Sequence, residues 1–542
     1  SRIAVPNQTS ASPVVSLSSR DIQLTGRSDI SDLINNLPQI VNNSLGQGLS
    51  NRTSGLSSAG GVTTADLRGL GPNRTLVLVD GIRLGQGSPP AARASPGADL
   101  NQIPSPLVER VDVLTGGASA VYGSDAIAGV VNFVLKRDFE GIQVDAQFGG
   151  NRANNDNEFV RGLVADIGET APTGTVNDGR NVNVNVVFGA NLADGRGNVT
   201  GYLGYLRADP VTSGSRDFGS CQLSLATAAL DDVGCVGSGN SNWFEPKSGP
   251  NATSGNVYSV QGSNFVDWGA GTTNPPALFN SQRYIYIGRD NERYQGGVLA
   301  HVDMSEQFKP YFQLFLTNDR TFQEIAPSGL FRDSNVYTDD GTYLVNCSNP
   351  LLSAQQAAVL CTPAEIAADR ASPGAASARV RIGRRNTEGG GRTSSYEHTN
   401  YRAVAGTRGS FGTAWNYDVY GQYFYTNFFQ SNDKYLSLRN VENALQVTGT
   451  RANPTCISGG ACVPWNIWSD GGVTDAALNY LYLPGTQAGN VEMRTVHADV
   501  TGNLGEYGLR SPLATDGLAF NVGYEQRRDG VEFRPDAASL SG

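Results

Sequence analysis

Hydrophobic residues alternate with small or polar residues along several stretches after residue 140. Ile142, Val144 and Phe148 alternate with Gln143, Asp145 and Gln147, and three valines from 182 to 186 alternate with three asparagines. A period of two places the apolar side chains on one face of an extended strand. The pattern predicts about nine strands, near residues 141–149, 182–192, 198–208, 291–302, 309–322, 396–409, 414–429, 491–503 and 517–529.

The connections between these strands alternate in length. Short polar turns are expected at 193–198, 305–309 and 411–415, and long segments at 150–180, 209–289, 324–394 and 431–489. Outer-membrane barrels have short turns on one side and long loops on the external side. A soluble β-sandwich also has alternating strands and remains the alternative, although it does not require all long connections to share one side.

Mean hydropathy does not decide between these architectures. Its value is −0.28, and no stretch offers the ~18 consecutive apolar residues of a membrane-spanning helix. A strand of a membrane barrel needs only ~10 residues of alternating pattern. A membrane location is therefore compatible with the composition.

The N-terminal part of the chain has a different pattern, in which glycine turns separate short apolar runs. The stretch 109–137, ERVDVLTGGASAVYGSDAIAGVVNFVLKR, predicts a strand, a glycine turn, one helical turn and a second strand. Upstream, the run 66–71 (DLRGLG) precedes a predicted strand from Thr75 to Arg83. A first strand is expected around Val14 to Leu17, a helix from Ser28 to Leu37, and loops at 42–62 and 85–99.

These two motifs, in this order and spacing, resemble the plug domain of TonB-dependent outer-membrane receptors. The resemblance is close for residues 10–140 and extends to the remainder only as a strand pattern. It implies a membrane β-barrel, antiparallel and with about 22 strands when complete, around an N-terminal α+β plug in its lumen. We therefore expect a plug at residues 1–138 and the first part of the barrel at 139–542, in a chain incomplete at both ends.

No pattern typical of an enzyme or of a nucleic-acid-binding protein is found. The glycines fit neither a phosphate-binding loop nor a nucleophile elbow, and the three histidines are scattered over different strands. The net charge of −10 and the lack of a basic run argue against nucleic acid. We expect no catalytic residues, no metal site and no cofactor.

The six cysteines form three close pairs, Cys221 with Cys235, Cys347 with Cys361, and Cys456 with Cys462. Sequential pairing is expected because each pair closes a short loop, and none has the spacing of a zinc or redox motif. Disulfides indicate an oxidising compartment. All three pairs fall in the long segments, which agrees with an external position for these segments.

The resemblance also implies which residues contact ligand and which hold the plug. Six charged plug residues are expected to pair with carboxylates of the barrel wall, through polar contacts that can slip and re-form in water; pairing within the plug is the alternative. These are Arg68, Arg74, Arg83, Glu109, Arg110 and Asp112. Ligand contacts are expected from plug loops (Asn51, Arg52, Pro72, Asn73, Gln86, Arg93) and external loops (Trp243, Phe244, Trp268, Trp465, Trp468). The loop aromatics could instead pack the loops together.

The expected function follows from the resemblance. Such a receptor binds a scarce ligand at its external face and imports it with energy from TonB and the inner-membrane motor. A ferric siderophore is the leading cargo, and an oligosaccharide or other large nutrient the alternative. The expected setting is the outer membrane of a Gram-negative bacterium, in contact with lipid, and a surface lipoprotein or other extracellular partner is left open. A non-transporting surface adhesin is the alternative from another class, although an adhesin has no use for a lumen-filling domain.

Overall fold

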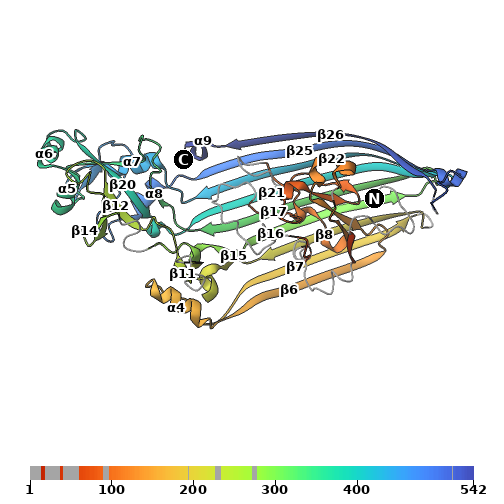
Figure 1. Cartoon of the computed structure of the whole chain (residues 1–542), viewed down its shortest axis with the longest axis horizontal. Helices are drawn as coiled ribbons and strands as arrows, with labels where there is room; N and C mark the ends of the chain where they lie inside the picture. The colour runs from red at the N-terminus through yellow and green to blue at the C-terminus, as the bar shows by residue number, and fades with distance from the viewer. Residues whose placement is uncertain are drawn as a thin grey trace.

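The structure is a computed structural model, which describes residues 14–18, 34, 37–40, 60–89, 97–116, 118–192, 195–225, 233–271, 278–514 and 517–541. It has three parts: a large antiparallel sheet (the wall), a small domain beside it (the plug), and a domain beyond one end of the strands (the cap) (Figure 1).

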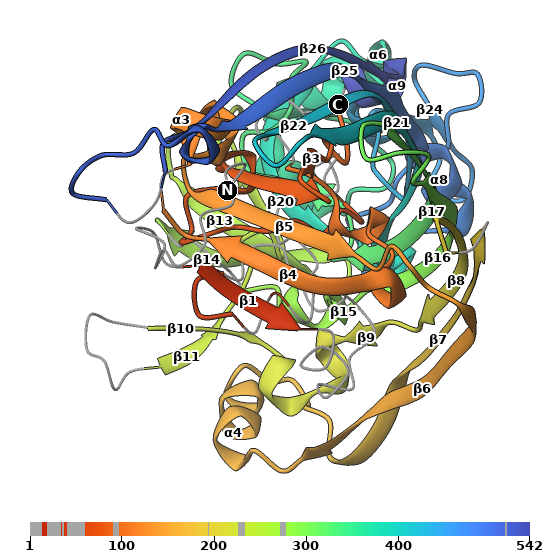
Figure 2. The same cartoon turned by 90° about the vertical axis from the view of Figure 1, so that its right-hand side faces the viewer.

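The wall contains nine strands in the order β26-β25-β22-β21-β17-β16-β8-β7-β6, so wall strands that follow one another along the chain are neighbours. It curves round the plug (Figure 2). The nine predicted strands are confirmed: β6 (Gly141–Asn155), β7 (Gly174–Leu192), β8 (Gly197–Ala208), β16 (Asp290–Val302), β17 (Lys309–Ile325), β21 (Arg392–Phe411), β22 (Trp415–Asp433), β25 (Gly485–Asn503) and β26 (Ala519–Pro535).

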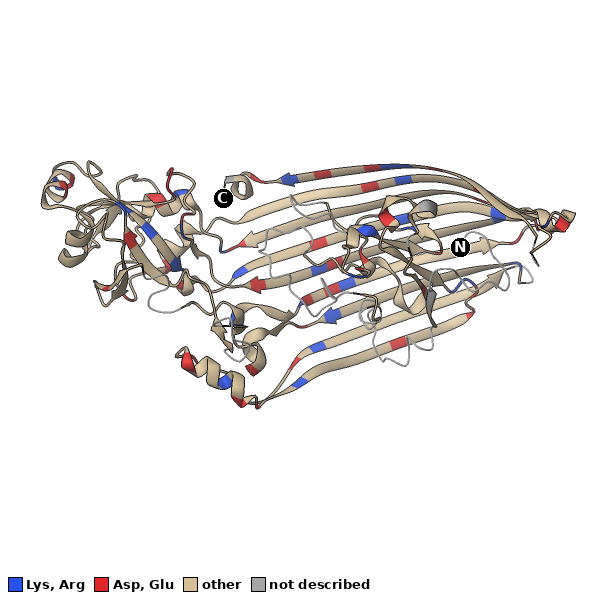
Figure 3. Cartoon of the chain, viewed as in Figure 1, with Lys and Arg blue, Asp and Glu red and all other residues tan. Residues whose placement is uncertain are grey.

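The two faces of the wall have different environments. On β17, Phe315 is buried against the plug while its neighbour Leu316 is 40% exposed on the outer face. On β22, Phe424 is buried and Tyr423 is exposed in the same way. The outer face is therefore rich in exposed apolar side chains. Figure 3 shows that charged residues of both signs also occur along the wall strands.

We expect Leu316→Arg to reduce insertion of the protein into a lipid bilayer, because Leu316 lies on the outer apolar face of a central strand, the face that the sequence pattern predicts to contact lipid. A charge there should cost about 2–4 kcal/mol if it lies near the bilayer midplane. The measurement is the free energy of unfolding in lipid vesicles. Leu316→Met is the matched control and should change it by less than about 1.5 kcal/mol. Equal effects of Arg and Met would show that this face is not in contact with lipid.

The plug contains a five-stranded sheet in the order β1-β4-β5-β2-β3. Its strands are β1 (Val14–Ser18), β2 (Thr75–Val79), β3 (Ile82–Arg83), β4 (Val108–Leu114) and β5 (Gly129–Leu135), with the short helix α3 (Ser119–Tyr122) between β4 and β5. The predicted first strand and the predicted strand–turn–strand of 109–137 are confirmed. The predicted helix 28–37 and the loop at 42–62 lie largely outside the described residues.

The prediction of one strand from Thr75 to Arg83 is wrong. Asp80 and Gly81 have φ angles of 52° and 81°, and they turn the chain back so that β2 and β3 form a hairpin. Positive φ at both central residues is the geometry of a type I′ turn, for which Asp-Gly is a favoured sequence. Apolar residues on both sides of the Asp-Gly pair give the stretch the appearance of one strand in the sequence.

The cap is a domain built from three of the long connections between wall strands. Its first element begins at residue 242 and its last ends at residue 481, and the wall strands between them are not part of it. It contains a six-stranded sheet of β12 (Asn242–Pro246), β13 (Asn256–Gln261), β14 (Asn264–Ala270), β18 (Gly329–Leu330), β19 (Tyr343–Asn346) and β20 (Ser377–Arg385). Its helices are α5 (Ala354–Leu360), α6 (Pro363–Ala371), α7 (Leu438–Leu445) and α8 (Asp475–Leu481). These elements share one hydrophobic core, so the long segments form a folded domain.

Apart from 3₁₀ turns, the remaining described elements are short α-helices and strands. They are α4 (Glu158–Asp166), α9 (Ala537–Ser541), β9 (Val211–Thr212), β10 (Gln222–Leu225), β11 (Val233–Val236), β15 (Tyr286–Gly288), β23 (Val447–Gly449) and β24 (Pro454–Cys456). Across the described part of the chain, no helix combines the length and apolar character needed to cross a membrane.

The three predicted disulfides are confirmed. Cys347–Cys361 and Cys456–Cys462 lie in the cap, and Cys221–Cys235 joins the β10–β11 segment. The long connections that carry them leave the same end of the wall strands, as predicted (Figure 1).

Candidate functional site: the plug docked against the wall

The β2–β3 hairpin of the plug is held by a chain of hydrogen bonds to three neighbouring wall strands. One carboxylate oxygen of Asp80 accepts from the Gln313 amide of β17 at 2.7 Å, and the other accepts from the backbone N–H of Leu135 at 3.0 Å. Arg402 of β21 donates to Gln313 and to Gln422 of β22, at 2.9 and 3.2 Å. The contacts place the turn of the hairpin against the inner face of the wall.

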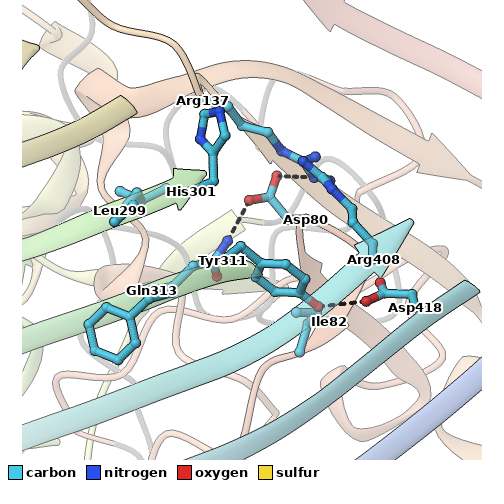
Figure 4. A pocket seen from close by; sticks show the side chains of 11 residues that line it. Asp80, Ile82, Arg137, Leu299, His301, Tyr311, Gln313, Arg408 and Asp418 are labelled. Carbon is cyan, nitrogen blue, oxygen red and sulfur yellow. Dashed lines mark hydrogen bonds and ion pairs between the residues drawn. The ribbon is translucent and has the colours of Figure 1, made fainter. Parts of the chain in front are cut away.

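A small cavity of about 40 Å³ lies beside Asp80 (Figure 4). It is lined by Asp80 and Arg137 together with Tyr311, Arg408 and Asp418 of the wall. Arg137 lies 3.9 Å from Asp80, and the Tyr311 hydroxyl donates to Asp418 at 2.8 Å. A polar cavity of this size has room for water.

A second docking point lies at the 3₁₀ turn Leu100–Gln102 of the plug. The Asn101 side-chain oxygen accepts from Arg293 at 2.6 Å, and its backbone carbonyl accepts from Gln295 at 2.6 Å. Arg293 is itself paired with Asp319 of β17 at 2.8 Å. Asp99 accepts from the backbone N–H groups of Thr63 and Asn101, and burial raises its pKa to about 7. This turn is therefore fixed on both its plug side and its wall side.

A third docking point joins the plug to β26. Asp125 lies 2.5 Å from Arg83 and 3.1 Å from Arg527 of the wall. Gln422 also donates to the backbone carbonyl of Arg83 at 3.0 Å. Among the predicted charged plug residues, Arg83 therefore contacts the wall through its backbone carbonyl, while its side chain pairs with Asp125 of the plug.

The other predicted charged residues make their described contacts inside the plug. Arg68 donates to the carbonyl of Ala128 and Arg74 to that of Leu70, both at 2.8 Å. Arg110 pairs with Asp112 at 3.2 Å, and Glu109 is exposed. For these residues the structure favours the alternative of pairing within the plug. The wall is reached instead by Asp80, Asn101 and Asp125, because these lie at turns that project from the plug sheet.

Contact between plug and wall is also apolar, which corrects the expectation of polar contacts alone. Wall side chains belong to the same hydrophobic cluster as the plug core residues Val77, Val131 and Phe133. They are Val187, Tyr202, Leu299, Phe315, Phe424 and Met493. Plug and wall therefore bury a common core on this side of the lumen.

The structure places only some of the predicted plug-loop contacts. Asn51, Arg52 and Arg93 lie outside the described residues. Pro72, Asn73 and Gln86 line a cavity of about 250 Å³ between the plug and strands β25 and β26, and the side chains of Asn73 and Gln86 are exposed. These three residues therefore line the same cavity and could contact one ligand together.

The predicted aromatic contacts fall into two groups. Trp243, Phe244, Trp465 and Trp468 are at most 2% exposed, and the last three belong to the cap core. Trp268 is 43% exposed, and its indole N–H donates to Ser259 at 2.9 Å. Burial favours the alternative that the first four pack the long segments together, and it leaves Trp268 accessible.

The histidines have partners that explain their positions. His301 lies 3.2 Å from Asp138, and His497 lies 2.8 Å from Asp499 and 3.3 Å from Glu525. The His398 ring packs on Phe428. Among the described residues, one cluster has metal-ligand geometry, Cys347, Cys361 and Glu365, but its two sulfurs form a disulfide and are not available as ligands.

The cap contains a buried carboxyl group whose titration we expect to affect stability. Burial raises the pKa of Glu442 in α7 from 4.5 to about 7, while the Asn335 amide donates to it. A raised carboxyl pKa makes the folded cap most stable below about pH 4.5, and this stability is lost as the pH rises to about 7. Glu442→Gln should remove this pH dependence in thermal unfolding of the cap. An unchanged pH profile in this variant would contradict the assignment.

Comparison with known proteins adds to this geometry. Residues 6–130 match the family model of the TonB-dependent Receptor Plug Domain. The ferric enterobactin receptor PfeA of Pseudomonas aeruginosa is 13% identical, with a TM-score of 0.40 over 97% of this chain and 60% of that one. The siderophore receptor PiuA of Acinetobacter baumannii is 11% identical (TM-score 0.38; 97% and 62%), and the ferric-catecholate import receptor Fiu of E. coli K12 is 12% identical (TM-score 0.32; 97% and 67%).

These structural likenesses are too weak to support an argument, and this chain spans 60% of the length of PfeA. The family match rests on the plug. The described residues of this match belong to the small domain that lies against the inner face of an antiparallel wall. Residues 6–130 therefore belong to a TonB-dependent receptor plug domain.

Proposed function

We propose that the full-length protein is an outer-membrane importer that takes up a scarce ligand with energy from TonB and the inner-membrane motor. The observation that carries this proposal is the docking of the plug. Side chains of β16, β17 and β22 donate hydrogen bonds to the plug, and a side chain of β21 donates to the β17 side chain that contacts it. Plug and wall also share an apolar core. A domain held in this way obstructs the space inside the wall.

Import then requires that the plug change its contacts. Each buried hydrogen bond that is broken without replacement costs about 1–3 kcal/mol, and the apolar contacts add to this. Thermal motion alone therefore leaves the closed arrangement dominant. A ligand contributes only its difference in affinity between the two arrangements, so the remaining work is assigned to the motor.

The proposed ligand is a ferric siderophore, and an oligosaccharide is the second candidate. The proposed contacts are Asn73 and Gln86 beside Pro72, the exposed Trp268, and Asn51, Arg52 and Arg93. Amide and guanidinium donors with an aromatic ring suit an iron chelate as well as a sugar. The siderophore is placed first because it is the leading cargo expected for a receptor with this plug domain.

We assign the plug to residues 1–138 and the barrel to 139–542. The apolar outer face of the wall is placed in outer-membrane lipid, with the cap and its disulfides outside the cell. TonB is assigned to the opposite side, where the short turns of the wall lie. No chemical reaction is part of this proposal.

Uptake by whole cells tests the proposed ligand. Cells with and without the receptor gene receive radiolabelled iron bound to catecholate or hydroxamate chelators, or labelled oligosaccharides of similar mass. We expect receptor-dependent accumulation of an iron chelate that stops when the motor is removed. Accumulation of an oligosaccharide alone would favour the second candidate. If the receptor-bearing cells bound other cells or extracellular matrix and accumulated none of these solutes, the protein would instead be an adhesin.

A further inference from the structure

Wall residues at one level form a continuous row across seven strands. Strand pairing places Val187, Tyr202, Gly297, Phe315, Arg402, Phe424 and Met493 side by side, each opposite the next. Apart from Gly297 and Arg402, all belong to the hydrophobic cluster shared with the plug. The row, which we call the belt, is therefore the level at which the wall packs on the plug core.

Arg402 is the one charged residue of the belt. Its side chain is buried, and its guanidinium lies over the Phe315 ring at 5.3 Å. Within the described part of the chain Arg402 forms no ion pair, and Asp80 is a carboxylate that acts on its guanidinium electrostatically from beyond ion-pair distance. A buried charge with no compensating partner is strongly unfavourable.

The compensation available to Arg402 runs through two glutamines. Nη1 donates to Gln313, whose amide donates to Asp80, and Nε donates to Gln422, whose amide donates to the Arg83 carbonyl. An amide has one acceptor and one donor end, so each glutamine is oriented by Arg402 to present its N–H₂ group to the plug. Both recipients belong to the β2–β3 hairpin.

We propose that Arg402 is a positioning residue that docks the β2–β3 hairpin and so sets the closed position of the plug. The inference rests on the proposed function. With the guanidinium removed, both glutamines are free to reverse, and Asp80 then faces an amide oxygen instead of a donor. The hairpin loses two hydrogen bonds to the wall, and the cavity beside Asp80 gives water access to the Asp80 carboxylate in place of Gln313.

The test is passage of a bulky hydrophilic antibiotic through the full-length receptor in cells without the motor. Arg402→Met should raise passage roughly tenfold, the effect of about one buried hydrogen bond on the open fraction. Asp80→Asn should also raise it. The double variant should leak no more than Arg402→Met, because both changes break the same chain of contacts. Tyr401→Phe, on the outer face of the same strand, is the control and should leave passage unchanged.

Hydrogen exchange separates this role from a general structural one. In Arg402→Met, amides of residues 76–88 should exchange faster while those of 108–114 keep their protection. Unchanged passage, additive effects in the double variant, or equal loss of protection in both segments would overturn the proposal. If Arg402→Met does not reach the membrane, Asp80→Asn decides the question by the same two readouts. Neither readout depends on the ligand or the motor, so failure here is distinct from failure of the proposed function.

Discussion

A full-length receptor that lacks residues 1–137 should admit solutes that the intact protein excludes. The plug lies against the concave face of the wall, and its core is continuous with wall side chains. Its removal deletes Asp80, Asn101 and Asp125, which carry the three polar docking points. The lumen is then no longer filled, and passage should no longer need energy.

The measurement is sensitivity of cells to a bulky hydrophilic antibiotic, with the same barrel in each strain. We expect passage at least about tenfold above that of the intact receptor, since several buried contacts of about 1–3 kcal/mol each are lost. The control is the empty vector, which accounts for the membrane itself. Equal resistance of cells with the intact and plug-free receptors, at equal amounts of inserted protein, would show that the plug does not close the lumen.

Trp468→Ala should unfold the cap while leaving the wall in place. Trp468 is fully buried, its ring packs on Phe244 at 5.2 Å, and its carbonyl accepts from Gln356 at 2.8 Å. Truncation of a buried tryptophan costs about 3–5 kcal/mol, a large part of the stability of a domain of this size.

Protease digestion of intact cells measures this effect, because cleavage within the cap reports its unfolding. Trp268→Ala is the matched control: the same truncation at an exposed ring of the same domain should cost less than about 1 kcal/mol. If both variants were equally resistant, the cap core would not depend on Trp468. If ligand binding were lost only in Trp268→Ala, the exposed ring would be assigned to the ligand site.

The strand pattern of the wall was predictable because each wall strand separates two environments. Phe315 faces the plug and Leu316 the outside, and this alternation appears directly in the sequence. The hairpin at Asp80 is missed because the apolar residues before and after the Asp-Gly pair are interpreted as one strand, although Asp-Gly is a favoured hairpin turn.

The cap and the docking contacts could not be predicted in the same way. The cap core joins residues from three separate connections, and the aromatic residues at 244, 465 and 468 show no period that indicates their meeting. The contact between Asn101 and Arg293 spans 192 residues of sequence. The local sequence pattern carries no information about such distant pairs. The charged residues of the plug motifs are therefore the only sequence guide to the contacts between plug and wall, and most of them pair within the plug.

The central claim is that ligand passes this receptor only when the motor supplies energy. The most direct measurement is uptake of a labelled ligand by cells that express the full-length protein, with and without TonB, at equal surface binding. We expect binding to be the same in both strains and uptake to be lost without TonB. Uptake that continues at the same rate without TonB would contradict the account and would make the protein a passive pore.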